Sequence, residues 1–299
     1  MGRRSHDRPP KAEARDGQFS ESERHLSGRT AWVTGGASGM GQATALRLAK
    51  AGANVAIGSL VESQRGVALK DQNVHTPADE SLVETRAAIE AHGVGAFAMA
   101  LDVCSDGSVQ ACFDAIVARF GKIDILINAA GSSARKLMLD HPDDIWQRII
   151  DTNLNGPYRT IRRCFPGMVE RRWGRIVNFA STAAKIGYVR HGAYCASKAG
   201  LLGLTRCVAL EGAPYGVSCN AVNPGWVATE SNYSACQQEI EIAGLDISVE
   251  EYRARVADGL PQKRFLDPDE VAALAAFLCR DEAFGINAED LTIAMGSSW

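Results

Sequence analysis

Residues 30–52, TAWVTGGASGMGQATALRLAKAG, join a short apolar run to an amphipathic stretch through a loop that is rich in glycine. The apolar beginning predicts a buried strand, and residues 41–52 predict the helix that follows it. Between the two, Gly35, Gly39 and Gly41 stand in a GxxxGxG spacing. Such a strand–loop–helix unit is typical of α/β domains with a parallel sheet.

Short apolar runs continue to alternate with helical segments toward the end of the chain. Further strands are predicted at residues 53–59, 95–103, 122–131, 174–181, 216–225 and 291–296, and further helices near residues 82–92, 106–120, 142–170, 194–213 and 268–280. Strands rich in Val, Ile and Ala that alternate with helices predict a parallel sheet covered on both faces. We therefore expect one α/β domain built on a doubly wound parallel sheet.

The composition narrows the class of protein. The chain has 299 residues, of which 46% are hydrophobic and 22% are charged, as in an ordinary globular protein. A net charge of −3 gives no general attraction for nucleic acid, and the longest apolar runs are too short to span a bilayer. The eight cysteines form no CxxC pair and no metal-ligand pattern, which indicates buried thiols in a reducing compartment. We expect a cytoplasmic protein that needs no metal.

Two kinds of segment fall outside the minimal α/β pattern. Residues 1–27 are polar and predict a disordered arm or a tail that contacts other subunits, which leaves residues 28–299 as the domain. Long insertions follow two of the strands, at residues 60–80 and at about 230–260. Because both leave the carboxyl ends of strands, where ligands bind in open α/β sheets, we expect residues 230–260 to form a helical lid over a substrate.

The lid segment has a mixed composition. Its larger side chains are Tyr233, Cys236, Ile240, Ile242, Leu245, Ile247 and Tyr252, and Trp226 precedes it. These residues predict a largely apolar substrate if they face the pocket. They fit equally well with a lid that packs on its own core.

The glycine loop predicts a dinucleotide site. Glycine lets the backbone turn tightly and come close to a pyrophosphate, while the amide groups at the following helix N-terminus face the anion. The predicted binding residues here are Gly35, Ser38, Gly39, Met40 and Gly41. Taken alone, a glycine loop also fits a simple tight turn between strand and helix.

The end of the second strand bears on the choice of cofactor. A carboxylate there would bind the ribose hydroxyls of NAD and repel a 2′-phosphate. The strand instead ends at Ser59, and no acidic residue follows before Glu62. Arg65 and Lys70 could neutralise a phosphate, so we favour NADP(H), with NAD(H) as the alternative.

Tyr194 and Lys198 lie four residues apart on a predicted helix, so their side chains share one face. An ammonium near a phenol is expected to lower the phenol pKa from its usual value near 10, which suits general acid–base catalysis. Ser181 is the last residue of the strand predicted at residues 174–181 and can bond a substrate oxygen. The pair also fits an exposed surface contact, and His191 is expected only at the rim of the pocket.

Seven motifs occur in a fixed order, and together they resemble the short-chain dehydrogenase/reductase family. They are TGGASGMG at 34–41, LDV at 101–103, NAAG at 128–131, DTNLNG at 151–156, IVNFAS at 176–181, YCASK at 194–198 and NPGWVAT at 223–229. The resemblance covers the chain from about residue 28 to its end. It implies a single Rossmann-type domain that transfers a hydride between NAD(P) and a secondary alcohol or ketone.

The resemblance also implies residue roles. Tyr194 would be the general acid/base, Ser181 would bond the substrate oxygen, Lys198 would bond the nicotinamide ribose, and Asn153 would hold a water that connects Lys198 to solvent. Asp102 would contact the adenine, and Val227 and Thr229 would hold the carboxamide. The same motifs place Val103, Asn128, Ala129, Gly131, Pro224 and Gly225 at the cofactor or behind it.

The family further implies a subunit contact through the helices near 142–170 and 194–213, so we expect a homotetramer or a dimer. Two other functions stay open from the sequence. One is an epimerase or dehydratase on the same scaffold, and the other is a nicotinamide-binding sensor without catalysis.

Overall fold

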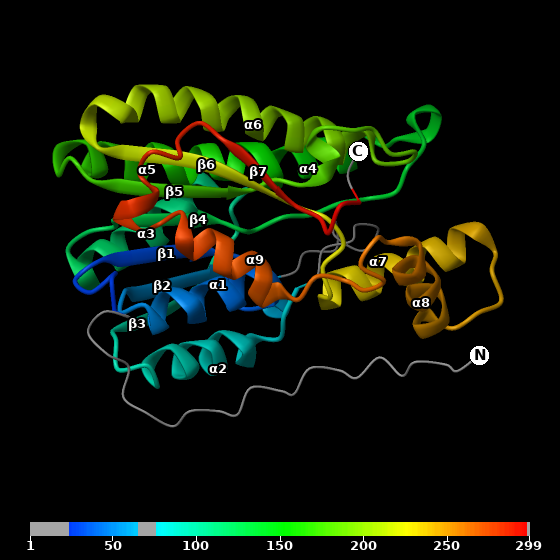
Figure 1. The fold of residues 1–299 in the computed structure, drawn as a ribbon, viewed down its shortest axis with the longest axis horizontal. Coiled ribbons are helices and arrows are strands. Elements are labelled where there is room, and N and C mark those ends of the chain that lie inside the picture. Colours follow the sequence, from blue (N-terminus) through cyan, green and yellow to red (C-terminus); the bar gives the residue numbers. More distant parts are fainter. Residues whose placement is uncertain (1–23, 65–75, 298–299) are drawn as a thin grey trace, which may run out of the picture.

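The computed structural model describes residues 24–64 and 76–297, and it contains one parallel sheet of seven strands (Figure 1). The strand order is β3-β2-β1-β4-β5-β6-β7, and every neighbouring pair is parallel. The strands are β1 (Thr30–Thr34), β2 (Asn54–Ser59), β3 (Ala96–Ala100), β4 (Ile125–Asn128), β5 (Gly174–Phe179), β6 (Val217–Pro224) and β7 (Asp290–Ile293). The predicted doubly wound α/β fold is confirmed.

Helices cover both faces of the sheet. They are α1 (Gly39–Lys50), α2 (Asp79–Glu90), α3 (Asp106–Phe120), α4 (Asp143–Ile150), α5 (Gly156–Glu170), α6 (Gly192–Gly212), α7 (Glu230–Ala243), α8 (Val249–Gly259) and α9 (Pro268–Phe277). Short 3-10 turns lie at Glu62–Gln64, Met138–Asp140, Thr182–Ala184, Ala213–Tyr215 and Asp281–Ala283. Helices α1, α2 and α9 lie on one side of the sheet, and α5 and α6 lie on the other (Figure 1).

The alternation of side chains along β1 shows why the sheet is buried on both faces. Ala31 and Val33 pack in the cluster that joins the sheet to α1 and α9. Trp32, between them, packs in the opposite cluster with residues of α3 and α5. Successive side chains of a strand point to opposite faces, so a strand covered by helices on both sides must be apolar throughout.

The sheet order reverses direction at β1. From β1 the chain adds β2 and β3 on one side, and β4 then pairs on the other side of β1. The loops after β1 and β4 therefore leave in opposite directions and open a crevice between them. In open α/β sheets this crevice at the carboxyl ends of the strands is where ligands bind.

Two boundaries differ from the sequence prediction. Leu26, which we assigned to the N-terminal arm, is only 2% exposed in the core, and its N–H bonds Ala51 O at 2.9 Å. The single helix predicted at 142–170 is two helices, because a π-helical turn at Asp151–Asn155 separates α4 from α5. The segment at 230–260 is helical as expected, in the two pieces α7 and α8.

Several predictions lie outside the described residues, namely those on residues 1–23 and on Arg65 and Lys70. In the described part of the chain, no helix is both long enough and apolar enough to cross a membrane.

Candidate active site

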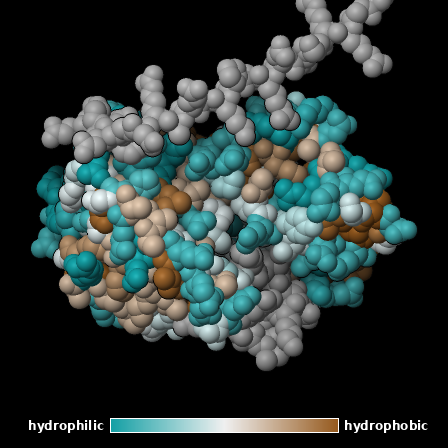
Figure 2. All heavy atoms as spheres, turned by 90° about the horizontal axis from the view of Figure 1, so that it is seen from below, coloured by the Kyte–Doolittle hydropathy of each residue, from teal (hydrophilic) through white to brown (hydrophobic). Residues whose placement is uncertain are grey.

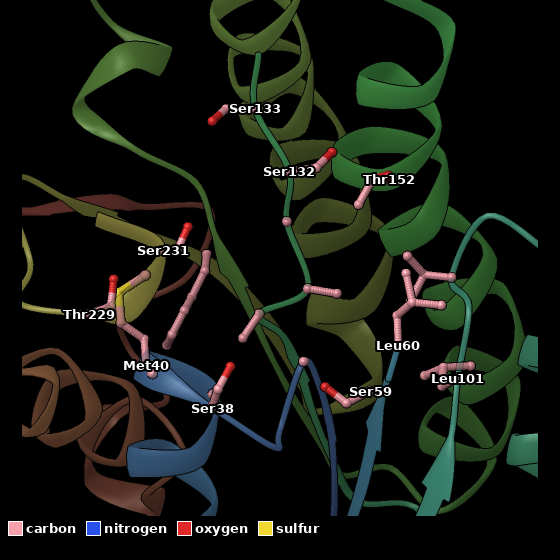
Figure 3. Close-up of a pocket in the computed structure, with 18 of the residues that line it drawn as sticks. Ser38, Met40, Ser59, Leu60, Leu101, Ser132, Ser133, Thr152, Thr229 and Ser231 are labelled. Atoms are coloured by element: carbon pink, nitrogen blue, oxygen red, sulfur yellow. The ribbon is translucent and has the colours of Figure 1, made fainter. Parts of the chain in front are cut away.

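A cleft opens at the carboxyl ends of the central strands, where the crevice is expected. Figure 3 shows Met40, Thr229 and Ser231 on one side of it, and Ser59, Leu60 and Leu101 on the other. Ser132 and Thr152 lie above them in the same view. Figure 2 shows the molecular surface hollowed between the body of the molecule and the end that carries α7 and α8.

The glycine loop lines one side of the cleft. Its backbone is packed so closely that a Cβ has no space at Gly35 or Gly41. Gly35 has a φ of +67°, and a Cβ on it would lie 2.8 Å from Ala130 N, in the loop after β4. A Cβ on Gly41 would lie 2.1 Å from Gly35 O. The loop can take this shape only with glycine at both positions. The start of α1, at Gly39–Gly41, lines the cleft together with Ser38.

Most of the predicted binding residues meet in this cleft. Its lining includes Gly35, Ser38, Gly39, Met40, Gly41, Ser59, Asp102, Val103, Ala129, Gly131, Thr229, Tyr194 and Lys198. They come from the loops after β1 and β4, the ends of β2 and β3, the N-cap of α7 and the start of α6. Segments far apart in the sequence therefore meet at this cleft. Ser38 caps α1 with extended backbone and no side-chain cap bond.

Six predicted residues do not line the cleft: Asn128, Asn153, Ser181, Pro224, Gly225 and Val227. Asn128 lies behind the cleft, where it donates to Asn178 Oδ1 at 2.8 Å and accepts from Thr160 at 2.7 Å. Pro224 ends β6, and the N–H of Gly225 bonds Ile293 O at 2.9 Å. Val227 is 5% exposed and pairs with Leu266. These four contacts support the sheet and the loop after β6.

Tyr194 and Lys198 face the cleft from the first turns of α6. Lys198 is buried, and its Nζ donates to Phe179 O at 2.7 Å, at the end of β5. The Nζ atom lies 5.7 Å from the centroid of the Tyr194 ring. Tyr194 also shares a hydrogen bond with the side chain of Ser181. Ser181, in the turn after β5, therefore lies together with Tyr194 and Lys198 of α6.

The protonation states differ from our expectation. Burial raises the pKa of Tyr194, and the Ser181 hydrogen bond lowers it only in part. Burial also lowers the pKa of Lys198 to about 8. We expected the ammonium to lower the phenol pKa, and this was wrong for the chain without ligand, because desolvation disfavours the charged form of both groups. The Tyr194 hydroxyl is thus protonated at neutral pH.

Asn153 links three segments of the chain through side-chain hydrogen bonds. It is fully buried in the π-helical turn, and its Oδ1 accepts from Ser132 N at 2.9 Å. Its Nδ2 donates to Ser132 O at 2.8 Å and to Ser197 Oγ at 3.0 Å. Both amide hydrogens are thereby used within the protein, so holding a water through this amide group stays a prediction.

Ser181 is positioned by the turn that follows β5. Its backbone is extended, and its Oγ accepts from Ala183 N at 3.1 Å, which caps the turn Thr182–Ala184. Since the oxygen accepts from the backbone and the Ser181 bond lowers the Tyr194 pKa, the Ser181 hydroxyl donates to the Tyr194 oxygen in this structure. His191, expected at the pocket rim, is the N-cap of α6, and its ring lies 6.4 Å from that of Tyr194.

The cleft also contains polar residues that the sequence analysis missed, among them Ser132, Ser133, Arg148 and Thr152. Arg148 and Thr152 stand four residues apart, and both precede Asn153 on the same helical segment. That spacing places them on one face, and it was the available signal. Ser132 Oγ is buried and has no hydrogen-bond partner among the described residues.

The lid segment is fastened to the loop after β4. Arg135 forms an ion pair with Glu239 of α7 and also donates to Gln238 Oε1 at 3.3 Å. The Arg135 side chain is 7% exposed and that of Glu239 is 25% exposed, so this contact is partly buried. The N–H of the next residue, Lys136, bonds Arg190 O at 3.0 Å, close to the start of α6. Of the lid itself, Glu230 and Ser231 line the cleft.

The apolar lid residues divide between its core and its surface. Cys236 and Ile240 are buried, whereas Tyr233, Ile242 and Leu245 are about two-fifths exposed. In the described part of the chain no group of three His, Cys, Asp or Glu side chains is arranged to hold a metal ion.

Comparison with known proteins gives consistent matches over nearly the whole chain. A family model described as enoyl-(acyl carrier protein) reductase matches residues 35–298. A D-beta-hydroxybutyrate dehydrogenase of Cupriavidus necator is 33% identical over 86% of this chain and 93% of its own length. The 3-oxoacyl-[acyl-carrier-protein] reductase FabG of Staphylococcus aureus is 30% identical over 90% of this chain and 97% of its own.

Among solved structures, an actinorhodin polyketide ketoreductase variant with NADPH is similar, with a TM-score of 0.80 and 33% identity. The match covers 90% of this chain and 97% of that one. The sheet order, the meeting of Ser181, Tyr194 and Lys198, and these matches lead to one conclusion: the chain belongs to the short-chain dehydrogenase/reductase family.

Proposed function

We propose that the chain is an NAD(P)-dependent oxidoreductase that interconverts a ketone and a secondary alcohol, with Tyr194 as its general acid/base. The observation that carries the proposal is the meeting of Tyr194, Ser181 and Lys198 beside the glycine-loop cleft. Relatives of similar length are reductases and dehydrogenases of oxygen-bearing carbons. An epimerase, a dehydratase or a sensor without catalysis is not favoured by these relatives.

Three features of the cleft fit a nicotinamide dinucleotide. The glycine loop lacks room for a Cβ at Gly35 and Gly41, which leaves the backbone open to a pyrophosphate. The first turn of α1 carries no acidic side chain that would repel an anion. Ser132 Oγ is buried at the cleft and has no partner in the described part of the chain, so it can bond a ligand there.

Tyr194, Ser181 and Lys198 have different roles in the reaction. When bound, the reduced cofactor supplies a hydride to the substrate carbon. Tyr194 Oη donates its proton to the substrate oxygen, and its raised pKa keeps that proton available at neutral pH. The Ser181 hydroxyl donates to the same oxygen and orients it. Lys198 lies between Phe179 O and the cleft, where its ammonium binds the nicotinamide ribose.

The cofactor is NADP(H) by preference, and NAD(H) is the alternative. Ser59, at the end of β2, lines the cleft at the place where a carboxylate would select NAD. A hydroxyl neither repels a 2′-phosphate nor anchors both ribose hydroxyls as a carboxylate does.

Substituting this position should alter the choice of cofactor. We expect wild-type protein to bind NADPH at least about tenfold more tightly than NADH, a difference of about 1.4 kcal/mol. Ser59→Asp should reverse the order, since the added charge repels the 2′-phosphate. Fluorescence titration of both cofactors measures this, with Ser133→Asp, elsewhere in the cleft, as control. Equal wild-type affinities would exclude the preference.

The substrate is a largely apolar ketone or alcohol. Tyr188, Val189 and Met138 are exposed by 44%, 76% and 67%. The His191 ring lies between two tyrosines, with its centroid 6.1 Å from that of Tyr188 and 6.4 Å from that of Tyr194. The apolar rim is therefore close to the general acid. A specificity constant that stays flat along a series of lengthening ketones would contradict this.

We also propose that the protein acts in the cytoplasm as a homotetramer. All eight cysteines are free, as expected in a reducing compartment. Tyr158 on α5 and Leu210 on α6 are 48% and 70% exposed, which favours a subunit contact there. Sedimentation at the mass of a single chain would contradict the tetramer, and recovery of the tagged protein outside the cytoplasm would contradict the location.

Replacing the general acid should separate catalysis from binding. Tyr194→Phe should lower kcat by about 10²- to 10⁴-fold, because the substrate oxygen loses its proton donor. The dissociation constant for NADPH should stay within about twofold. Tyr188→Phe is the matched control, since it removes a tyrosine hydroxyl at the rim. Near-normal turnover by Tyr194→Phe would show that the acid has been misassigned.

Deprotonation of the buried Lys198 should lower kcat/KM for NADPH at alkaline pH. The Lys198 pKa of about 8 means that the ammonium is present below pH 8 and is lost as the pH rises through this value. We expect kcat/KM for NADPH to be level below pH 8 and to fall about tenfold per unit well above it. Lys198→Arg, which stays charged, should lack the decline. A wild-type profile that is level to pH 10 would contradict the assignment.

Loosening the lid should weaken substrate binding and leave the cofactor site intact. Arg135→Met removes the buried partner of Glu239, so α7 loses its attachment to the loop after β4. We expect the KM for the ketone to rise about tenfold, while the Kd for NADPH changes less than about twofold. Arg255→Met, which breaks an exposed pair within α8, is the control. An unchanged KM would argue against the lid.

A further inference from the structure

We propose that Arg148 is a positioning residue for the nucleobase of the cofactor, where it works with Asp102 to select adenine. This inference rests on the proposed use of a nicotinamide dinucleotide. It concerns the end of the cleft that is lined by Leu60, Leu101 and Thr152 (Figure 3).

The first observation is the way in which Arg148 holds Asp102. Arg148 Nη2 bonds Asp102 Oδ1 at 3.2 Å, and Nη1 bonds Oδ2 at 3.3 Å, so the guanidinium grips both carboxylate oxygens. Such a fork fixes the plane of a carboxylate as well as its charge. Cys104 N adds a bond to Oδ1 at 2.9 Å, whereas Oδ2 receives only the bond from Arg148 among the described contacts. One acceptor site on Oδ2 is therefore left for a ligand.

The second observation concerns the remaining donor of Arg148. Its Nε is buried, and no acceptor in the part of the chain that the structure describes bonds it. A buried donor of a charged group without a partner is costly, so a ligand that supplies the acceptor gains affinity. Arg148 lines the cleft, as Asp102 does.

The backbone of Arg148 is hydrogen-bonded to the next turn of its helical segment. Thr152 Oγ1 donates to Arg148 O at 2.9 Å, one helical turn further along, and Thr152 also lines the cleft. Cys104 Sγ lies 3.3 Å from Thr152 Oγ1, which joins this turn to the segment after β3. The carboxylate and the guanidinium therefore reach the cleft from two elements with their relative position fixed.

The pair presents a carboxylate acceptor whose orientation Arg148 fixes, and the walls around it are apolar. Leu60, Leu101 and Val103 line the same end of the cleft. An adenine has an exocyclic amine that donates, and Asp102 Oδ2 can accept from it. A hypoxanthine replaces the amine by a carbonyl oxygen, which would face the Asp102 carboxylate unfavourably. Arg148 and Asp102 together thus distinguish the two bases.

The test compares NADPH with its deamino analogue, reduced nicotinamide hypoxanthine dinucleotide phosphate, by fluorescence titration. Wild-type protein should bind NADPH about tenfold more tightly than the analogue, the effect of about one charge-assisted hydrogen bond. Arg148→Met should weaken NADPH about tenfold and reduce the preference to less than about threefold, because the carboxylate can then turn. Arg148→Lys, which keeps the charge without the fork, should restore only part of the preference.

A control variant separates base selection from a general structural effect. Arg163→Met removes another largely buried arginine, which pairs with Asp106 at 2.8 Å outside the cleft, and should leave the preference as in wild type. Thermal unfolding without cofactor identifies variants that are merely unstable. A preference that is absent in wild type, or that is unchanged or larger in Arg148→Met, overturns the inference. Failure of wild type to bind either dinucleotide overturns the proposed function instead.

Discussion

The close approach of two backbone loops is the constraint on which the site depends. Gly35 lies so near to Ala130 that a Cβ would be 2.8 Å from its nitrogen, and Gly41 lies against Gly35 in the same way. The Gly35 contact joins the loop after β1 to the loop after β4 at the point where the sheet order reverses, and the Gly41 contact holds the start of α1 against Gly35. The start of α1, the Ala129–Gly131 segment and the end of β2 are thereby brought around one cleft. Any side chain at these glycines would separate walls that the cofactor has to touch together.

Much of the fold followed from local patterns. Apolar runs such as residues 30–36 and 122–131 cannot be exposed, and their alternation with helices leaves few arrangements other than a parallel sheet. The meeting of the glycine loop with Ser59 and Asp102 at one cleft could be predicted for the same reason. The carboxyl ends of parallel strands meet at one edge, so residues just beyond them must lie close to one another.

What the sequence could not supply were properties that arise from contacts across long separations. The raised pKa of Tyr194 results from burial, which depends on how α6 packs and not on the lysine four residues away. Asn153 bonds Ser132 and Ser197, at separations of 21 and 44 residues. The contact between Arg148 and Asp102 spans 46 residues. No periodicity within one element reports such contacts, and the start of the domain at Leu26 was missed for a similar reason.

The π-helical turn at Asp151–Asn155 has a consequence for how this segment serves two purposes. A wider turn accommodates one extra residue, and each residue of a helix rotates the following side chains by about 100°. The angular phase of α4 is thus decoupled from that of α5. Helix α4 can direct polar groups toward the nucleotide, while α5 keeps Ile161 and Met168 against the sheet. Deleting a single residue from this turn would bring the two halves back into phase, and one of the two faces would then point the wrong way.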